Sequence, residues 1–263
     1  MRLLLTGMNG TLAPKLAALA RARGWEVLGW DRQRIPADGG EAAAAWLATQ
    51  RVEAIAHLAL GAEAWAAQLA DYAGARGLPF LFTSTAMVFD HQPDGPHRPF
   101  DLRTARDDYG RYKIRCEDAV RAKNPRASIA RLGWQIDPQA CGNNMLAALD
   151  AQQARDQRIR ASTRWIPACS FMEDTVAALL QLLGAPLGAT VHLDSNAREG
   201  YTFAELVSAL RRSFAREHWV LEPTTDYVHD QRLLDDEVRV PELSARLPEL
   251  RARGTPEGPV PRC

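Results

Sequence analysis

Short apolar runs alternate with amphipathic stretches along the first half of the chain. Runs with the composition of buried strands cover residues 2–6, 25–30, 52–60, 80–83 and 127–132. Between them, apolar residues recur at helical spacing, which predicts helices over residues 12–23, 41–50, 62–75 and 107–121. Since strands that alternate with helices form parallel sheets, we expect an α/β fold built on a Rossmann-type, doubly wound parallel sheet.

The second half of the chain is less regular. The patterns predict helices over residues 143–155, 172–183 and 203–214, an extended stretch over 158–168, and strands over 190–193 and 218–221. Residues 91–103 read as a loop, and proline and charge dominate 235–263, whose last ten residues we expect to form a loose tail. We therefore predict a dinucleotide-binding core of residues 1–135, to which 160–195 return, and a smaller C-terminal substrate lobe of 136–159 and 196–263.

Charge and cysteine content exclude several classes of protein. The 263 residues include 32 lysines and arginines and 32 aspartates and glutamates, so no net field favours nucleic acid or an anionic membrane. No apolar stretch is long enough to cross a bilayer and the first residues lead straight into a strand, so we expect no signal peptide and a cytoplasmic protein. Because Cys116, Cys141, Cys169 and Cys263 form no C-x-x-C pair, we expect reduced thiols and no metal site.

A glycine-containing turn joins the first predicted strand to the first helix, with the sequence Thr6-Gly7-Met8-Asn9-Gly10-Thr11-Leu12-Ala13. Gly7 would allow a tight turn, Gly10 would let the backbone approach a pyrophosphate, and Ala13 would let helix and strand pack closely. The helix N-terminus offers N–H groups to phosphate. The residues predicted to hold the diphosphate of a dinucleotide are Gly7, Met8, Asn9, Gly10, Thr11 and Leu12.

The ends of the next two strands carry further candidate cofactor residues. Asp31 comes about 20 residues after the turn, where a carboxylate accepts hydrogen bonds from an adenosine ribose. Arg32 and Arg34 follow and could accept a 2′-phosphate, so both NAD and NADP remain open. His57-Leu58-Ala59 ends the third strand and is expected to line the cofactor. A catalytic role for His57 is the weaker alternative, because no acid lies near it in sequence.

Tyr109-Gly110-Arg111-Tyr112-Lys113 lies on a predicted helix, where residues four apart share one face. A nearby ammonium should lower the pKa of the Tyr109 phenol from its usual value of about 10. Tyr109 would then act as general acid toward a carbonyl being reduced, while Lys113 tunes it and hydrogen-bonds the nicotinamide ribose. Thr85, at the end of the preceding strand, would hydrogen-bond the same substrate oxygen. The alternative is a surface helix with an exposed tyrosine and lysine.

These motifs resemble the extended short-chain dehydrogenase/reductase family, and within it the dTDP-4-dehydrorhamnose reductase branch, over residues 1–183. The glycine turn is similar to the family's Thr-Gly-x-x-Gly-x-x-Gly loop, and Tyr109-x-x-x-Lys113-x-x-x-Glu117 is similar to its catalytic helix. Ser84-Thr85-Ala86-Met87 aligns with a Ser-Thr-Asp-Tyr segment, whose Asp-Tyr is replaced here. Arg131-Leu132-Gly133-Trp134 and Gly142-Asn143-Asn144 resemble elements that line a sugar-nucleotide site. The resemblance implies substrate contacts from Thr85, Ala86, Met87, Trp134, Asn143 and Asn144.

The reacting groups and the resemblance together predict an NAD(P)-dependent reductase. It would transfer a hydride to a keto group of a nucleotide-linked sugar, with Tyr109 as proton donor. One alternative is NAD-dependent epimerase or dehydratase chemistry on the same scaffold, although Ala86-Met87 does not supply the acid-base pair of a dehydratase. Another is a cofactor-binding regulatory subunit without turnover. We expect a monomer or a homodimer.

Overall fold

The computed structural model describes residues 1–89, 95–139 and 142–250. Part of the predicted 91–103 loop, the predicted loose tail, Cys141 and Cys263 lie outside these residues. Cys116 and Cys169 are free thiols, and both are buried.

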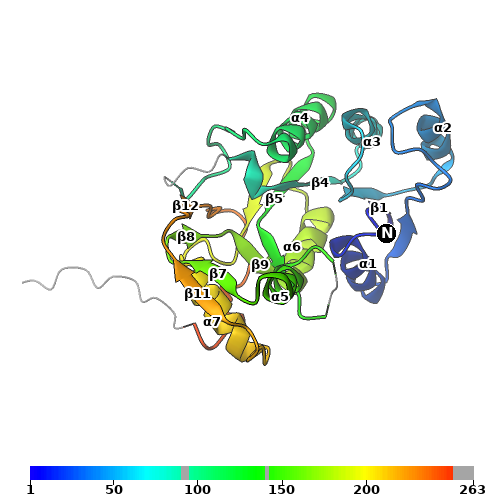
Figure 1. The fold of residues 1–263 in the computed structure, drawn as a ribbon. Coiled ribbons are helices and arrows are strands. Elements are labelled where there is room, and N and C mark those ends of the chain that lie inside the picture. Colours follow the sequence, from blue (N-terminus) through cyan, green and yellow to red (C-terminus); the bar gives the residue numbers. More distant parts are fainter. Residues whose placement is uncertain (90–94, 140–141, 251–263) are drawn as a thin grey trace, which may run out of the picture.

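Within the described residues, six parallel strands form the central sheet in the order β10-β5-β4-β3-β1-β2 (Figure 1). They are β1 (Arg2–Thr6), β2 (Glu26–Gly29), β3 (Ala54–His57), β4 (Phe80–Thr85), β5 (Ser128–Leu132) and β10 (Thr190–Leu193). The predicted α/β class is confirmed. The direction of winding reverses between β1 and β3, and open parallel sheets bind ligands at such a point, beyond the carboxyl ends of the strands.

Helices cover both faces of the sheet. In Figure 1, α3 and α4 lie above it and α1 and α6 below it. Because side chains alternate across a strand, Leu3 and Leu5 of β1 pack with α1 and α6, whereas Leu4 packs with α2 and α3. The helices are α1 (Leu12–Ala22), α2 (Glu41–Thr49), α3 (Glu63–Arg76), α4 (Asp108–Lys123) and α6 (Met172–Gly184), and a short 3₁₀ helix, η1 (Ala86–Val88), follows β4.

The C-terminal part of the chain forms small parallel strand pairs and helices beside the main sheet. Leu146, Leu206 and Leu243 belong to its own hydrophobic core, so even the proline-rich stretch after residue 235 contributes a buried turn of helix. The pairs are β6 (Trp134–Ile136) with β9 (Cys169–Phe171), β7 (Ile159–Ser162) with β11 (Leu221–Thr224) and β8 (Trp165–Ile166) with β12 (His229–Asp230), and the helices are α5 (Met145–Asp156), α7 (Phe203–Ser213) and α8 (Leu243–Arg246).

The strand predicted over residues 218–221 is wrong, since β11 begins only at Leu221. Side-chain contacts with α5 occupy the residues before it. The buried Trp219 donates its indole N–H to Asp150 at 2.8 Å, and the Val220 N–H donates to the Gln153 side chain at 2.8 Å. These bonds direct the segment onto α5 rather than into a ladder.

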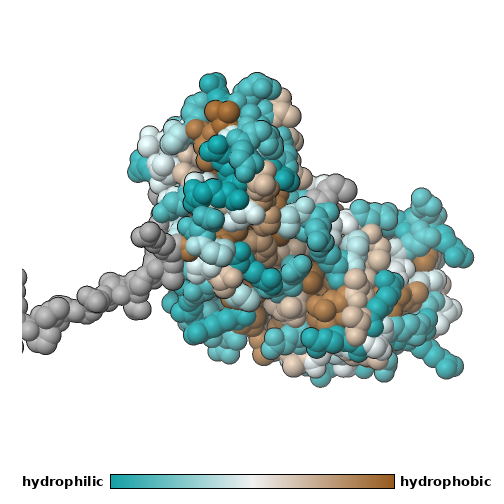
Figure 2. Space-filling view, turned by 90° about the horizontal axis from the view of Figure 1, so that it is seen from below, coloured by the Kyte–Doolittle hydropathy of each residue, from teal (hydrophilic) through white to brown (hydrophobic). Residues whose placement is uncertain are grey.

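The face of the protein seen from below is mainly polar. Hydrophilic side chains cover most of the face shown in Figure 2, and apolar residues form smaller patches between them. Trp65, Phe80 and Phe82 are among the largest side chains that are fully buried, whereas Phe100 and Leu102 are exposed. None of the helices in the described ranges has the length and apolar character required to span a membrane.

Candidate active site

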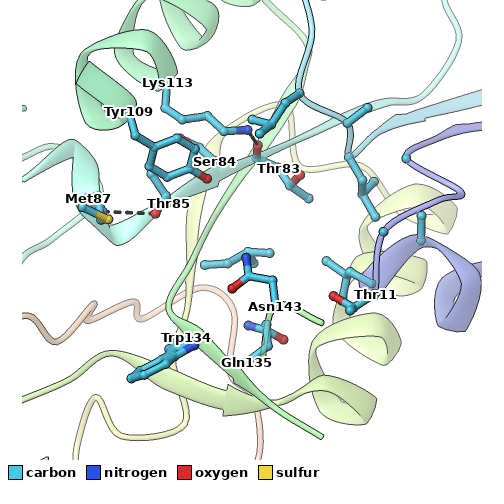
Figure 3. Close-up of a pocket in the computed structure, with 18 of the residues that line it drawn as sticks. Thr11, Thr83, Ser84, Thr85, Met87, Tyr109, Lys113, Trp134, Gln135 and Asn143 are labelled. Atoms are coloured by element: carbon cyan, nitrogen blue, oxygen red, sulfur yellow. Dashed lines mark hydrogen bonds between the residues drawn. The ribbon is translucent and has the colours of Figure 1, made fainter. Parts of the chain in front are cut away.

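A pocket of about 710 Å³ lies at the carboxyl ends of the central strands, a size typical of small-molecule sites. Figure 3 shows Tyr109, Lys113, Ser84 and Thr85 on one side of it and Trp134 and Gln135 on the other. Most residues proposed from the sequence line it: Gly7, Met8, Asn9, Gly10, Thr11, Leu12, Arg32, Leu58, Ala59, Thr85, Ala86, Met87, Tyr109, Lys113, Trp134 and Asn143. Asp31, His57 and Asn144 do not line it.

The turn after β1 requires its glycines. Gly7 has a φ of +89°, which favours glycine, and a Cβ there would lie 3.3 Å from the backbone of Leu58 and Ala59. The Gly10 N–H donates to the Gly7 carbonyl at 2.8 Å, which closes the turn. The loop therefore lies directly against the end of β3.

Thr6 links β1 to β3 beneath this turn. Its hydroxyl oxygen accepts hydrogen bonds from the N–H groups of Leu58 at 3.0 Å and Ala59 at 3.1 Å. The same oxygen lies 2.8 Å from Nδ1 of His57. Because the hydroxyl has a single proton and the other partners are both donors, it donates to Nδ1 and leaves the imidazole proton on Nε2.

His57 packs behind the pocket instead of lining it. Its side chain points to the sheet face that α3 covers, with ring centroids 4.6 Å from Trp65 and 5.6 Å from Phe82. Burial, and then the charges of Lys113 and Arg32, lower the pKa of His57 from 6.5 to about 3. The neutral ring is thus a packed and hydrogen-bonded part of the core.

The N-terminus of α1 is suited to an anion. Thr11 is the N-cap residue, yet its side chain accepts no hydrogen bond from the helix backbone, and the first turn contains no acidic residue. Thr11 and Leu12 both line the pocket. Uncapped N–H groups and the positive end of the helix dipole favour a phosphate at this place. The glycine turn and this helix end therefore fit the diphosphate of a dinucleotide.

Asp31 and Arg32 have different positions after β2. The Asp31 carboxylate accepts a hydrogen bond from the Gln33 N–H at 2.9 Å and lies outside the pocket lining. Arg32 lines the pocket, with its guanidinium 5.3 Å from the centroid of the Trp65 ring and hydrogen-bonded to the Leu60 carbonyl. A cation is therefore held where the adenosine end of a dinucleotide would lie.

Helix α4 is placed by its first turn. Asp107 is the N-cap, and its side chain accepts from the Gly110 N–H at 2.8 Å. A Cβ at Gly110 would lie 2.1 Å from the Met87 carbonyl oxygen, so only glycine allows α4 to approach η1 this closely. The approach brings Tyr109 beside Thr85, a constraint that the sequence analysis did not identify.

The phenol of Tyr109 differs from the prediction in its acidity. Burial raises its pKa, although a hydrogen bond with the Thr85 hydroxyl acts in the opposite direction. The prediction that Lys113 lowers the pKa of Tyr109 is wrong for this structure. The Lys113 ammonium instead donates to the carbonyl of Thr83 on β4, at 2.9 Å. Tyr109 is therefore protonated near neutral pH.

Lys113 is almost completely buried and lies 4.7 Å from the centroid of the Phe82 ring. Burial lowers its pKa from 10.5 to about 8, while the more weakly acting Cys116 and Glu117 raise it. At neutral pH the side chain is still mainly an ammonium. It supplies a fixed positive charge at the floor of the pocket, between the strand end and Tyr109.

A buried ion pair ties α4 to the sheet. Arg131 of β5 donates to the two carboxylate oxygens of Glu117 at 3.0 and 2.8 Å. Burial alone would raise the pKa of Glu117, but the hydrogen bonds and charge of Arg131 outweigh it and lower the pKa. A further Arg131 nitrogen lies 3.3 Å from Nε2 of His192 on β10. The helix that carries Tyr109 is thereby joined to two strands.

The side of the pocket opposite Tyr109 comes from later parts of the chain. Asn144 faces away from it and caps α5, where its side chain accepts from the Ala147 N–H at 3.1 Å. Thr83 and Ser84 could have been identified from the sequence, because they precede the candidate Thr85 on the same strand. No neighbouring motif identifies Gln231 as a pocket residue. Leu132 and Gly133 line the pocket and belong to a segment that the sequence analysis likened to a sugar-nucleotide site. The lining residues that it did not assign to the site are Ala13, Trp30, Leu60, Thr83, Ser84, Gln135, Trp165 and Gln231.

Known proteins share both sequence and fold with this chain. The model of the RmlD substrate binding domain family matches residues 1–225. The dTDP-4-dehydrorhamnose reductase of Mycobacterium tuberculosis is 28% identical over 210 residues, which cover 73% of this chain and 69% of that protein. A probable low-salt glycan biosynthesis reductase, Agl14 of Haloferax volcanii, is 28% identical over 123 residues, 46% of this chain and 41% of that protein.

Solved structures extend the likeness in fold. A dTDP-4-dehydrorhamnose reductase from Bacillus anthracis in complex with NADP superimposes with a TM-score of 0.79 at 16% identity, covering 94% of this chain and 96% of that one. Its counterpart from Clostridium acetobutylicum gives 0.77 at 18% identity, over 89% and 90%. At sequence identities this low, the two solved structures show only that the fold is shared. The family model matches most of the length of this chain, and the chain therefore belongs to the RmlD substrate binding domain family.

Proposed function

We propose that this protein is an NAD(P)-dependent reductase that acts on the keto group of a nucleotide-linked sugar, with Tyr109 as the proton donor. One observation carries the proposal. The same pocket contains the uncapped N-terminus of α1, which can bind a phosphate, and the side chains of Tyr109, Thr85 and Lys113. The dTDP-4-dehydrorhamnose reductases among the similar proteins, one of them in complex with NADP, support it.

The chain offers a distinct group to each part of a dinucleotide. The turn from Gly7 to Leu12 would hold the diphosphate, and Arg32 would face the adenosine ribose. Asp31, the residue before Arg32 and just outside the pocket lining, would accept hydrogen bonds from the same ribose. Lys113 would hydrogen-bond the nicotinamide ribose. The reduced cofactor supplies a hydride to the carbonyl carbon.

Tyr109 and Thr85 complete the reduction at the carbonyl oxygen. As the carbon gains hydride, the oxygen gains negative charge and takes the Tyr109 proton, so that a C–H and an O–H bond form and the ketone becomes an alcohol. The pKa of Tyr109, raised by burial, keeps that proton available at neutral pH. The Thr85 hydroxyl, which is hydrogen-bonded to Tyr109, stabilises the resulting phenolate until solvent returns a proton.

The chemistry of the lining disfavours dehydration. Among the described residues that line the pocket, none is an aspartate or a glutamate, and Ala86 and Met87 stand beside Thr85. Elimination of water requires an additional acid and base, and the described lining of this pocket contains no carboxylate that could supply them. Epimerase chemistry, or cofactor binding without turnover, remains the alternative outcome of the test below.

The test begins with NADH and NADPH titrated separately while nicotinamide fluorescence is followed, and continues with dTDP-4-dehydrorhamnose as the oxidant. Tyr109→Phe should reduce turnover by at least about a hundredfold and leave cofactor affinity nearly unchanged. Tyr112→Phe, on the same helix, is the matched control and should retain activity, because the Tyr112 hydroxyl donates to the Gly61 carbonyl at 2.8 Å.

Equal turnover by Tyr109→Phe and the wild type would contradict the proton-donor role. Cofactor binding without any turnover would favour a regulatory subunit or a different substrate. If neither NADH nor NADPH bound, the interpretation of the glycine turn would be wrong, and the reductase proposal with it.

A further inference from the structure

The side of the pocket facing Tyr109 is formed by uncharged polar and aromatic groups, which we call the amide end. It consists of the carboxamides of Gln135, Asn143 and Gln231 and the indoles of Trp134 and Trp165. Among the described lining residues, the charged side chains are Arg32 and Lys113, which come from the cofactor side of the pocket. A carboxamide can both donate to and accept from a hydroxyl group, and an indole face packs on apolar surface. The amide end therefore suits an uncharged ring that carries hydroxyl groups.

The backbone around Gln231 is held on both sides. The Gln231 N–H donates to the Ile166 carbonyl at 2.9 Å, next to Trp165, where β12 pairs with β8. Two residues later, the Leu233 N–H donates to the buried Asp194 carboxylate at 2.9 Å. The position of Gln231 beside Trp165 is therefore set before any ligand arrives.

The side chain of Gln231, by contrast, is not used by the protein. Within the described parts of the chain its carboxamide forms no hydrogen bond, although it lines the pocket. Gln135 differs, because its amide donates to the Gly133 carbonyl at 3.1 Å. Because the backbone is already fixed, the entropic cost of binding a ligand here is limited to ordering this one side chain.

We propose that Gln231 is a substrate-binding residue that selects an uncharged, hydroxyl-bearing ring at the amide end. This inference rests on the proposed function and specifies which part of the substrate lies there. Gln231 lies six residues beyond residue 225, the last residue that the family model matches. The substrate would lie with its carbonyl toward Tyr109 and its hydroxyl groups toward Gln231, against Trp134 and Trp165.

Calorimetric titration of the NADP⁺-saturated protein with dTDP-rhamnose and with dTDP separates the ring from the nucleotide. Gln231→Leu removes both hydrogen-bonding atoms at similar volume. It should weaken dTDP-rhamnose about 5- to 50-fold, as expected for one or two lost hydrogen bonds, and leave dTDP and NADP⁺ unchanged. Gln181→Leu is the matched control, since Gln181 is exposed on α6, and it should alter none of the three affinities.

The outcomes separate this inference from the proposed function. If Gln231→Leu binds dTDP-rhamnose as the wild type does, or loses affinity for dTDP to the same extent, the inference is overturned. Failure of the wild type to bind dTDP-rhamnose more tightly than dTDP also overturns it. A wild type that shows ring-dependent binding through Gln231 but no turnover would keep the inference and refute the reductase.

Discussion

The Thr6→Val substitution should destabilise this protein much more than the loss of one oxygen atom suggests. Valine preserves the shape of threonine but replaces the hydroxyl with a methyl group. Thr6 has no exposed surface, so water cannot take over the bonds of its hydroxyl to the Leu58 N–H, the Ala59 N–H and His57 Nδ1. All three partners would lose this hydrogen bond, and two of them, the Ala59 N–H and His57 Nδ1, are buried.

The expected loss in the free energy of unfolding follows from the number of groups that lose their hydrogen bond. Each buried donor or acceptor without a partner costs about 1–3 kcal/mol, so with partial relaxation we expect about 2–5 kcal/mol for Thr6→Val. For a chain of this length that corresponds to a fall in Tm of roughly 5–15 °C. Urea unfolding at neutral pH, followed by circular dichroism, measures the free energy directly.

Thr6→Ser is the matched control, because it retains the hydroxyl and removes only one methyl group. It should cost about 1 kcal/mol, the value of one buried methylene-sized group. If Thr6→Val were no less stable than Thr6→Ser, the hydroxyl would not be the link between β1 and β3. A second readout is cofactor affinity, which should fall in Thr6→Val alone, since Leu58 and Ala59 line the pocket.

Three further predictions concern acid stability, cofactor choice and helix placement. The pKa of His57 is about 3 in the folded protein and 6.5 in the unfolded chain. Below pH 6.5 the unfolded chain therefore binds more protons than the folded protein, and the fold loses stability as the pH falls. Between pH 7 and pH 5 the wild type should lose roughly 2 kcal/mol more than His57→Gln in urea unfolding, and parallel curves would contradict the neutral, buried ring. Asp31→Ala should weaken NADH more than NADPH in fluorescence titrations, because only an unphosphorylated ribose can use that carboxylate; equal losses would remove its assigned role. Gly110→Ala should cost about 1–3 kcal/mol and reduce turnover, since its Cβ would lie 2.1 Å from the Met87 oxygen, whereas Gly184→Ala, with no atom within 4 Å, should be tolerated.

Local patterns accounted for the elements and for the first half of the site. The apolar runs marked all six strands of the sheet, because strands covered by helices on both faces are rich in apolar residues, as in β1 and β4. The helix that carries Tyr109 was recognised from its helical periodicity, and the glycine turn from its spacing. Strand 218–221 was misplaced, since the pattern alone could not reveal that Trp219 and Val220 bond to α5.

Contacts between distant parts of the chain decided the rest. The pKa of Tyr109 depends on its burial and on where the Lys113 ammonium is anchored, and neither follows from their spacing of four residues. His57 and Asn144 were candidates by sequence neighbourhood, but their side chains point to the α3 face of the sheet and to the backbone of α5.

The sequence by itself determined the order of strands and helices that gives the fold class, the glycine turn, and the presence of Tyr109 and Lys113 on one helix, because each of these signals lies within a few neighbouring residues. Only the tertiary structure decided which side chains face the pocket and what charge they carry there. Gln231 illustrates the reason, since its place beside Trp165 results from the pairing of β8 with β12, two short strands that are far apart along the chain.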